Sequence, residues 1–422
     1  FLGTLYNITD MAWIGLLGSK AVAAVGVGGM YVWLSQGLAS LARMGGQVHV
    51  AQCLGRGDKE QAHRYAKTAV QLSILLGLAF AAVSLLFTDP LVGFFKLEGV
   101  KTILDAKIYM RITCGLILFS FLNLTLTGLY TAQGDSKTPF VANFIGLLIN
   151  LLLDPLLILG VGPFPRIEVA GAAVATVSAQ FVVMFVMMVG VFRSKKEENV
   201  LKGIRLFEPF SKEELGNICK IGGPTAIQGM VYCMISMVLT RMVAAFGAEA
   251  IATQRVGGQI ESVSWNTADG FAAALNAFVG QNYGAKKMDR VQKGYRISFW
   301  TVAIWGALIM LAFIIFPGPI AGVFFHEEKA MEIAISYLII IGFSEAFMCV
   351  ELMTIGALSG LGKTKLCSVI SITATSMRIP LAMVLSRTSL GLDGIWWALT
   401  LTSVAKGIIF YLTFRYQMRE KC

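Results

Sequence analysis

The sequence predicts an all-α integral membrane protein with twelve transmembrane helices, the first of them truncated, in two six-helix lobes related as parallel repeats. Three observations support this fold class. The chain is too apolar for a water-soluble fold, its apolar residues gather in long runs, and several short segments recur at a nearly constant distance along the chain.

Apolar residues make up 56% of the 422 residues and charged residues only 14%, with a mean hydropathy of +0.70. A soluble chain carries roughly 25% charged residues, so this one lacks the material for a surface that faces water on all sides. The lipid bilayer is therefore its expected surrounding, and at ~20 apolar residues per span about twelve spans fit the length. The seven Cys and three His are scattered, which argues against a disulfide framework or a zinc site.

Eleven apolar runs are long enough to cross a membrane. Because lipid offers the backbone no hydrogen-bond partners, each run must be helical, and none alternates as the strands of a barrel do. The runs are approximately residues 22–47, 68–88, 108–132, 138–162, 169–192, 221–245, 249–280, 297–317, 330–358, 366–386 and 392–414. Residues 1–17 are interpreted as the C-terminal half of a truncated first helix, since the chain begins at Phe1 rather than at Met.

Positive charge is unevenly divided between alternate connections. The set that begins with residues 55–67 and ends with the tail from residue 415 holds 22 Lys and Arg residues, and the opposite set holds 7. The positive-inside rule then places both termini in the cytoplasm. We expect the chain in the cell inner (plasma) membrane. This distribution also accounts for the net charge of +10, so no nucleic-acid partner is expected.

The longest polar segment lies near the middle of the chain. We interpret residues 193–220 as a cytoplasmic linker between an N-terminal lobe, residues 1–192, and a C-terminal lobe, residues 221–422. Each lobe would hold six helices, an even number, so both repeats start on the same side of the membrane. They are therefore expected to be parallel rather than inverted repeats.

Internal repetition supports this division. Segments ending at Gly29 and Gly258 match at an offset of 229 positions, and Gly134 and Gly362 end segments that match at 228. Val-Ala-Gly171 and Leu-Asp-Gly394 match at 223. Such glycines are typical of close helix packing and tight turns, and here they serve as evidence of duplication rather than of a binding site.

Ionisable groups at bilayer depth are costly and therefore need a reason. Asn150 and Asp154 lie four residues apart on one helix face, and Pro155 removes the backbone donor that would have bonded the Leu151 carbonyl. Asp10 offers a second carboxylate and Thr176 a hydroxyl if their helices converge. Oxygen ligands of this kind suit Na⁺, and paired carboxylates also suit a proton, so the residues alone leave Na⁺ and H⁺ open.

Several motifs resemble the multidrug and toxic compound extrusion (MATE) family over essentially the whole chain. They are Leu5-Tyr-Asn-Ile-Thr-Asp10, the segment from Gln52 to Asp58, Gly134-Asp-Ser-Lys137, Asn150 with Asp154-Pro155, Gly171-Ala-Ala-Val-Ala-Thr176 and Val279-Gly-Gln-Asn-Tyr-Gly284. The resemblance implies two six-helix lobes around a central cavity that opens alternately to each side. It also implies secondary antiport, with export of small organic, often cationic, drug-like compounds in exchange for inward Na⁺ or H⁺.

The resemblance is closer to the bacterial DinF-like branch than to the NorM-like branch. In the DinF-like branch, residues that match Asp10, Asn150, Asp154 and Thr176 form the coupling-ion site of the first lobe, with Na⁺ at the first three as the metal option. The NorM-like branch places a Glu a few residues after the proline of the seventh helix, where this chain has Gln228 after Pro224.

The second half instead carries acids in its eighth and tenth helices. These residues, with one aromatic neighbour, are Glu261, Trp265, Asp269, Glu345 and Glu351. Two interpretations stay open: a structural ion-pair network with Arg255 or Arg378, or a cation- and substrate-binding wall that includes a second coupling site. Arg378 and Pro380 stand roughly where the first half has Asp154 and Pro155. Trp265 and Tyr232 suit either an adaptable drug pocket or ordinary packing against lipid.

Three alternatives to an antiporter have weaker support. A lipid-linked precursor flippase of a related fold would need a strongly cationic cavity, an integral membrane enzyme would need a catalytic cluster, and a channel fits the deep, sparse acids less well. The segment Gly360-Leu-Gly-Lys-Thr364 lacks the first glycine of a phosphate-binding loop, since Ala357 stands there. We therefore expect no enzymatic activity, no ATP, no cofactor beyond the coupling ion, and a monomer.

Overall fold

The computed structural model describes residues 13, 14, 17, 19–95, 97, 99–160, 165–194, 199–206, 208, 209, 211–324 and 328–419, and all their regular structure is α-helical. The chain divides into two compact units, with the division between Gly229 and Met230. This point lies inside the long helix α9 (Lys212–Ala244), rather than in the preceding loop. The lobe and linker boundaries given above remain a prediction.

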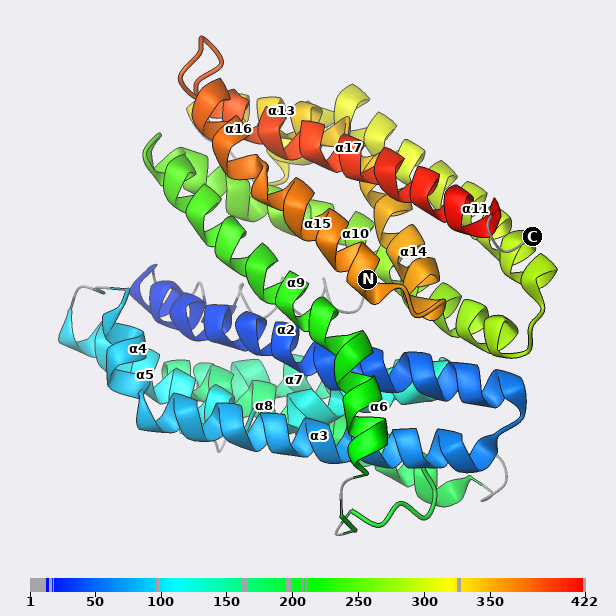
Figure 1. Ribbon diagram of the computed structural model, residues 1–422. Helices are drawn as coiled ribbons and strands as arrows, with labels where there is room; N and C mark the ends of the chain where they lie inside the picture. Colours follow the sequence, from blue (N-terminus) through cyan, green and yellow to red (C-terminus); the bar gives the residue numbers. More distant parts are fainter. Residues whose placement is uncertain are drawn as a thin grey trace. The chain divides into compact units, whose positions relative to one another are not determined.

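The described residues of the first unit form seven helices before α9. They are α2 (Ser19–Arg56), α3 (Lys59–Leu86), the short α4 (Thr88–Gly93), α5 (Val100–Gly115), α6 (Leu118–Ala132), α7 (Lys137–Ile158) and α8 (Glu168–Arg193). Helix α2 packs against α3, α5 and α6, while α7 and α8 form a pair (Figure 1). Small residues such as Ala42, Ala66 and Ala69 make up much of the buried core, as expected where helices approach closely in a membrane.

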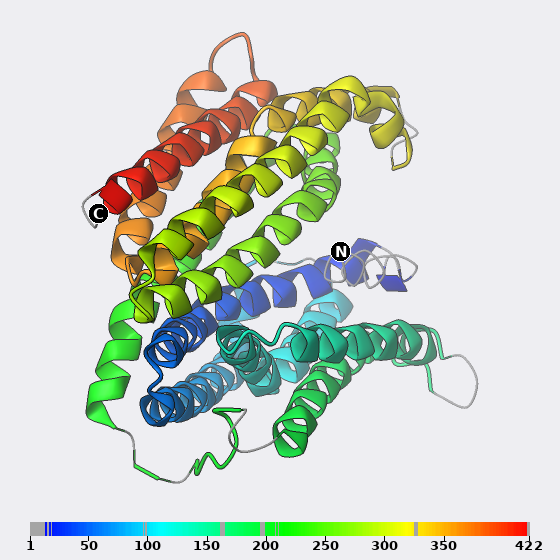
Figure 2. The ribbon, with the colours of Figure 1, turned by 90° about the vertical axis from the view of Figure 1, so that its right-hand side faces the viewer.

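The second unit repeats this arrangement. After α9 come α10 (Ala248–Gly284), α11 (Met288–Ile315), the short α12 (Pro317–Gly322), α13 (Glu328–Gly342), α14 (Glu345–Gly360), α15 (Thr364–Ser376), α16 (Arg378–Leu385) and α17 (Leu392–Arg419). Helix α14 packs against α10, α11 and α17, and Figure 2 shows α10 and α11 running side by side.

All eleven predicted spans fall on helices. Ten of them are long and apolar enough to cross a membrane when α5 with α6 and α13 with α14 are each counted as one span, bent by 43° and 49°. Helix α10 covers the remaining predicted span, but its charged residues, among them Arg255, Glu261 and Asp269, make it more polar than the others. The predicted partial helix at residues 1–17 lies almost entirely outside the described residues. The all-helical, two-lobed membrane fold is therefore confirmed.

The duplication is visible in matching contacts. A Cβ on Gly28 would collide with the ring of Tyr109 in the first unit, and a Cβ on Gly257 would collide with the ring of Tyr337 in the second. The glycines are 229 positions apart and the tyrosines 228. The same tight glycine–tyrosine packing is therefore built twice, at the offset that the sequence motifs predicted.

The turns repeat as well. Gly134 and Gly362, at an offset of 228, both adopt positive φ, 85° and 78°, which glycine accepts without steric cost. Gly57 has φ of 81°, and its counterpart 229 positions later is Lys286 with φ of 59°. The left-handed conformation is thus retained where the glycine is not.

Candidate functional site

The centre of the candidate site lies on α7. The carboxylate of Asp135 accepts hydrogen bonds from the backbone N–H groups of Lys137 and Thr138, at 3.0 Å each, which fixes the start of this helix. Asn150 and Asp154 then lie one turn apart near its other end and are 1% and 0% exposed. The Asn150 amide donates from Nδ2 to Asp154 Oδ1 at 3.2 Å, and the Asn150 carbonyl oxygen is buried with no hydrogen-bond partner in the described part of the chain.

Helix α8 brings Thr176 to the same level. Two close contacts fix the register of the antiparallel pair: a Cβ on Gly171 would lie 2.6 Å from the Leu157 carbonyl, and one on Gly146 would lie 3.4 Å from the Ala179 carbonyl. Thr176 lies between these two contacts along α8. Its Oγ1 is buried, also without a hydrogen-bond partner among the described residues.

The fourth predicted ligand, Asp10, lies outside the described residues. Ile14, four positions later in the sequence, is buried in a cluster with Ile158 at the end of α7 and Ala172 on α8. Of the predicted first-lobe set, the described structure joins Asn150 and Asp154 by a hydrogen bond and places Thr176 on α8, the helix packed against α7. The Asn150 carbonyl oxygen and the Thr176 hydroxyl can each accept a further bond, and Asp154 supplies a carboxylate. Oxygen ligands of this kind suit a hard cation or a proton.

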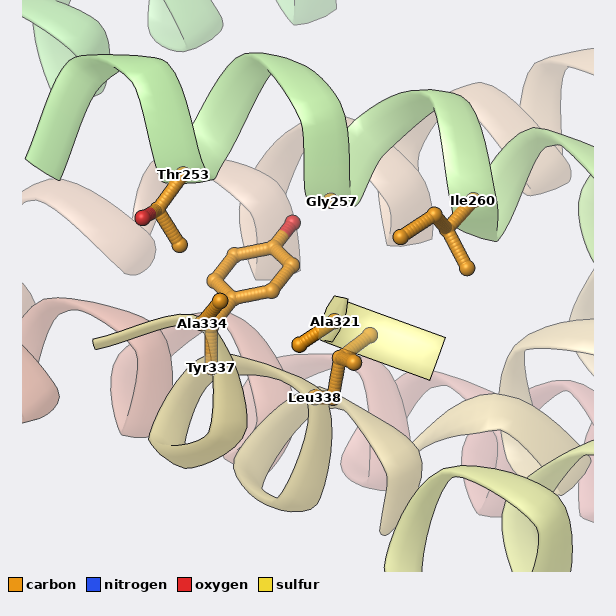
Figure 3. Close-up of a pocket in the computed structure, with 7 residues that line it drawn as sticks. All are labelled: Thr253, Gly257, Ile260, Ala321, Ala334, Tyr337 and Leu338. Atoms are coloured by element: carbon orange, nitrogen blue, oxygen red, sulfur yellow. The ribbon is translucent and has the colours of Figure 1, made fainter. Parts of the chain in front are cut away.

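The second unit carries a different set of groups. Glu261 on α10 accepts a hydrogen bond from the hydroxyl of Tyr337 on α13. Figure 3 shows the Tyr337 ring crossing from α13 toward α10 at Gly257, beside a small apolar gap lined also by Thr253, Ile260, Ala321, Ala334 and Leu338. This gap is too small for a water molecule, so the contact serves packing and holds Glu261 in place.

Glu345 is the most deeply buried acid of the set. It is the first residue of α14, directly after the bend from α13, and it is 0% exposed. Neither carboxylate oxygen has a hydrogen-bond partner within 3.5 Å among the described residues. The nearby Ser264 hydroxyl contacts Cys349 Sγ at 3.2 Å, and Glu261 acts on Glu345 electrostatically.

Glu351 is placed differently. Its Oε1 lies 2.8 Å from Nζ of Lys406 on α17, and both side chains are 6% exposed. The ion-pair interpretation therefore holds for Glu351, but with a lysine rather than with the predicted Arg255 or Arg378. Lys406 was missed, although a lysine in the middle of the apolar run 392–414 is itself a signal of a buried partner.

Trp265 and Asp269 follow Glu261 on α10 at intervals of four residues and are both exposed on the surface of their unit, Trp265 by 42%. The structure therefore separates the five predicted second-lobe residues into three settings. Glu261 bonds Tyr337 and interacts electrostatically with the buried Glu345, Glu351 pairs with Lys406, and Trp265 and Asp269 are exposed on α10. No three His, Cys, Asp or Glu side chains converge as metal ligands among the described residues.

The register of the repeat corrects one expectation. Gly171 packs on the Leu157 carbonyl, and Gly394 packs in the same way on the Leu385 carbonyl. Leu157 and Leu385 are 228 positions apart, so the counterpart of Asn150 is Arg378, and the counterpart of Asp154 is Ala382. Arg378 therefore takes the place of the amide and not, as the prolines suggested, that of the carboxylate.

A duplicated helical membrane fold with a few deeply buried acids and no catalytic cluster among the described residues defines a membrane transporter. The family model named MatE matches residues 1–156 and 224–384, once in each half. The chain belongs to the MatE family of multidrug efflux transporters. Members of this family are transporters and not enzymes, which confirms the expected lack of enzymatic activity.

Relatives and solved structures agree with this assignment. The probable multidrug resistance protein NorM of Thermotoga maritima is 28% identical over 99% of this chain and 90% of its own length. The FAD transporter of Shewanella oneidensis is 24% identical over 96% of this chain and 89% of its own length. A MOP superfamily transporter from Pyrococcus furiosus has the same fold, with a TM-score of 0.91 at 23% identity, covering 100% of this chain and 93% of that structure.

Proposed function

We propose that this transporter is a secondary antiporter that exports small organic compounds in exchange for inward Na⁺ or H⁺ by alternating access. The coupling ion binds in the first unit, on Asp154, Asn150 and Thr176, with Asp10 as a further ligand. The observation that carries this proposal is the buried Asn150–Asp154 pair, whose Asn150 oxygen lacks a hydrogen-bond partner in the described chain, as does the buried Thr176 hydroxyl on the adjacent helix α8. A bound ion would supply the partner that these buried oxygens lack.

Several features support the finer parts of the proposal. The names of the relatives, multidrug resistance and multidrug export proteins among them, support export rather than the flipping of a lipid-linked precursor. Gln228 after Pro224, together with the acids of the first half, supports a DinF-like rather than a NorM-like placement, although one relative carries the name NorM. The distribution of Lys and Arg supports an inner-membrane location with both termini in the cytoplasm.

The second-unit acids have a supporting role in this proposal. Glu351 is neutralised by Lys406, which leaves Glu261 and Glu345 as the groups available for a second coupling step or for contact with a cationic substrate. Trp265 and Asp269, exposed on α10, are offered as substrate contacts. The protein is proposed to act as a monomer without ATP.

Reconstituted vesicles test the proposal. Vesicles are loaded with a fluorescent organic cation, Na⁺ and pH gradients are imposed separately, and export is followed for the wild type and for Asp154→Asn. Because a charged hydrogen-bonding group contributes roughly 1.5–3 kcal/mol, gradient-driven export should fall by about tenfold or more. The matched control is Asp289→Asn, an exposed acid in the first turn of α11, which should export like the wild type. Undiminished export by Asp154→Asn would overturn the coupling site.

A further inference from the structure

Arg378 carries a buried guanidinium that contacts no carboxylate in the described part of the chain. It is 6% exposed, and among the described residues no acid lies within 4 Å of it. Its Nε donates to Thr402 Oγ1 at 3.0 Å, and its Nη2 donates to Ser403 Oγ at 2.9 Å. Two hydroxyls of α17 thus hold the guanidinium, but they supply no negative charge. A permanent charge at this depth is costly unless it has a function or a counter-charge.

An aromatic ring lies over the same group. The Arg378 Cζ is 5.8 Å from the centre of the Tyr232 ring, which α9 contributes within the second unit. This is cation–π distance. The ring is 41% exposed although the guanidinium beneath it is buried. Tyr232 therefore stands between Arg378 and the surface of its unit, where an aromatic molecule can stack on it.

Bonding capacity remains on the guanidinium. Arginine carries five N–H donors in a planar fork, and two donations are assigned here. The remaining geometry suits a carboxylate or phosphate oxygen, to which arginine binds with short, strong, charge-assisted bonds. Glu261 interacts with Arg378 electrostatically but forms no ion pair with it. The positive charge of Arg378 is therefore only partly offset by Glu261.

The buried arginine is found in the second unit and not at the matching position of the first. At the corresponding position of the first unit stands Asn150, a member of the candidate cation site. The two units therefore differ at this position: one has the amide and carboxylate of the candidate cation site, and the other has a guanidinium that, among the described residues, contacts hydroxyls and a ring but no acid.

We propose that Arg378, held by Thr402 and Ser403 and covered by Tyr232, binds the anionic group of an aromatic carboxylate or phosphate that the protein transports. This inference rests on the proposed transport function and extends its substrate class from organic cations to aromatic compounds with a carboxylate or phosphate. Tyr232 stacks on the ring, and Arg378 takes the anionic end.

Equilibrium binding to the purified protein tests the site without relying on transport. The probes are 2-naphthoate and 2-naphthamide, which share their shape but differ in charge, measured in phosphatidylcholine nanodiscs. The wild type should bind the carboxylate about tenfold more tightly or better, which corresponds to one charge-assisted contact. Arg378→Gln should abolish this preference and leave 2-naphthamide binding unchanged. Glu261→Gln should increase the preference, because it removes the competing negative charge.

If Arg378→Gln does not fold, the double variant Thr402→Val with Ser403→Ala serves in its place. It keeps the guanidinium but removes its two hydrogen bonds, and it should also lose most of the preference for 2-naphthoate over 2-naphthamide. Equal binding of the two probes by the wild type, or a preference that survives either variant, would overturn the proposal. Nanodiscs containing phosphatidylglycerol test whether the site binds a lipid headgroup or a soluble ligand. If this anionic lipid abolishes the binding of 2-naphthoate, the site belongs to the lipid and the inference is contradicted. If the vesicles show no gradient-driven export but the protein still prefers 2-naphthoate to 2-naphthamide, the antiport proposal is wrong and the anion site at Arg378 is retained.

Discussion

Glu351 and Lys406 form an ion pair inside the second unit, with 2.8 Å between Oε1 and Nζ and each side chain only 6% exposed. In the first unit, the residue that corresponds to Glu351 is Asn123, which donates to the side chain of Gln180 on α8 at 2.7 Å. Neutral amides therefore join α6 to α8 in the first unit, and an ion pair joins the corresponding helices α14 and α17 in the second. The duplication preserves the helices and their crossings, while the polar groups between them have diverged.

The ion pair gives the first prediction. Glu351→Gln and Lys406→Met, made singly, each leave one charge buried and unpaired, which should cost roughly 3–5 kcal/mol of stability. The double variant Glu351→Asn with Lys406→Gln recreates the amide pair of the first unit and should cost less than either single change. Thermal unfolding in detergent measures all three. A double variant less stable than both single variants would show that the pair is not replaceable in this way.

A second prediction concerns the glycine that sets α8 against α7. A Cβ on Gly171 would lie 2.6 Å from backbone atoms of Leu157, so Gly171→Ala must push the helices apart. Overpacking of this kind costs about 1–3 kcal/mol, and here it should also separate Thr176 from Asp154 and weaken coupled export.

Gly26→Ala is the matched control, because nothing lies within 4 Å of a Cβ at Gly26, in the third turn of α2. Alanine is the better helix former by up to about 1 kcal/mol, so this variant should be as stable as the wild type or more stable. Equal thermal stability of Gly171→Ala and Gly26→Ala would argue against the tight α7–α8 contact.

The segment that follows α8 should respond to acid. The ammonium of Lys67 on α3 lies 2.7 Å from Glu208 Oε2 and lowers the pKa of that carboxyl below its usual value. A lowered pKa means that the contact contributes fully above the unfolded-state pKa of about 4.3 and is lost as the pH falls through the folded-state value. The pair is partly exposed, so its contribution is small and salt-sensitive.

Hydrogen exchange at residues 199–206, corrected for the intrinsic rate, should therefore become faster as the pH falls from about 6 to below about 4. Glu208→Gln should remove this pH response and show the faster exchange throughout. The same pH response in Glu208→Gln would mean that another group controls the segment.

Much of the fold could be predicted from the sequence, because the bilayer leaves a long apolar run no alternative to a helix. All eleven predicted spans fall on helices, and the motif offsets recur as contacts such as Gly28–Tyr109 and Gly257–Tyr337. The bends between α5 and α6 and between α13 and α14 were not predicted. No proline marks them; Gly115 lies beside the first break, and Gly342, Ser344 and Glu345 lie beside the second.

The polar groups were harder to predict, because their roles depend on partners from other helices. Asn150 and Asp154 were predicted as neighbours, since a spacing of four guarantees a shared helix face. The pairing of Glu351 with Lys406 joins residues 55 positions apart, and no local pattern indicates which buried cation reaches which acid. The alignment of Arg378 with Asp154 was wrong because the prolines lie at different positions in the two repeats; the glycine contacts give the correct register.

In the proposed mechanism, the first unit couples transport to an ion, and the second unit does not do so alone. The most direct test measures ion movement itself: vesicles are loaded with organic substrate, and uptake of radioactive sodium and the internal pH are recorded while the substrate leaves. The wild type should move Na⁺ or H⁺ in proportion to substrate, and Glu345→Gln should retain this ratio. Asp154→Asn should release substrate with no accompanying ion. An unchanged ion-to-substrate ratio in Asp154→Asn, or its loss in Glu345→Gln alone, would contradict the claim.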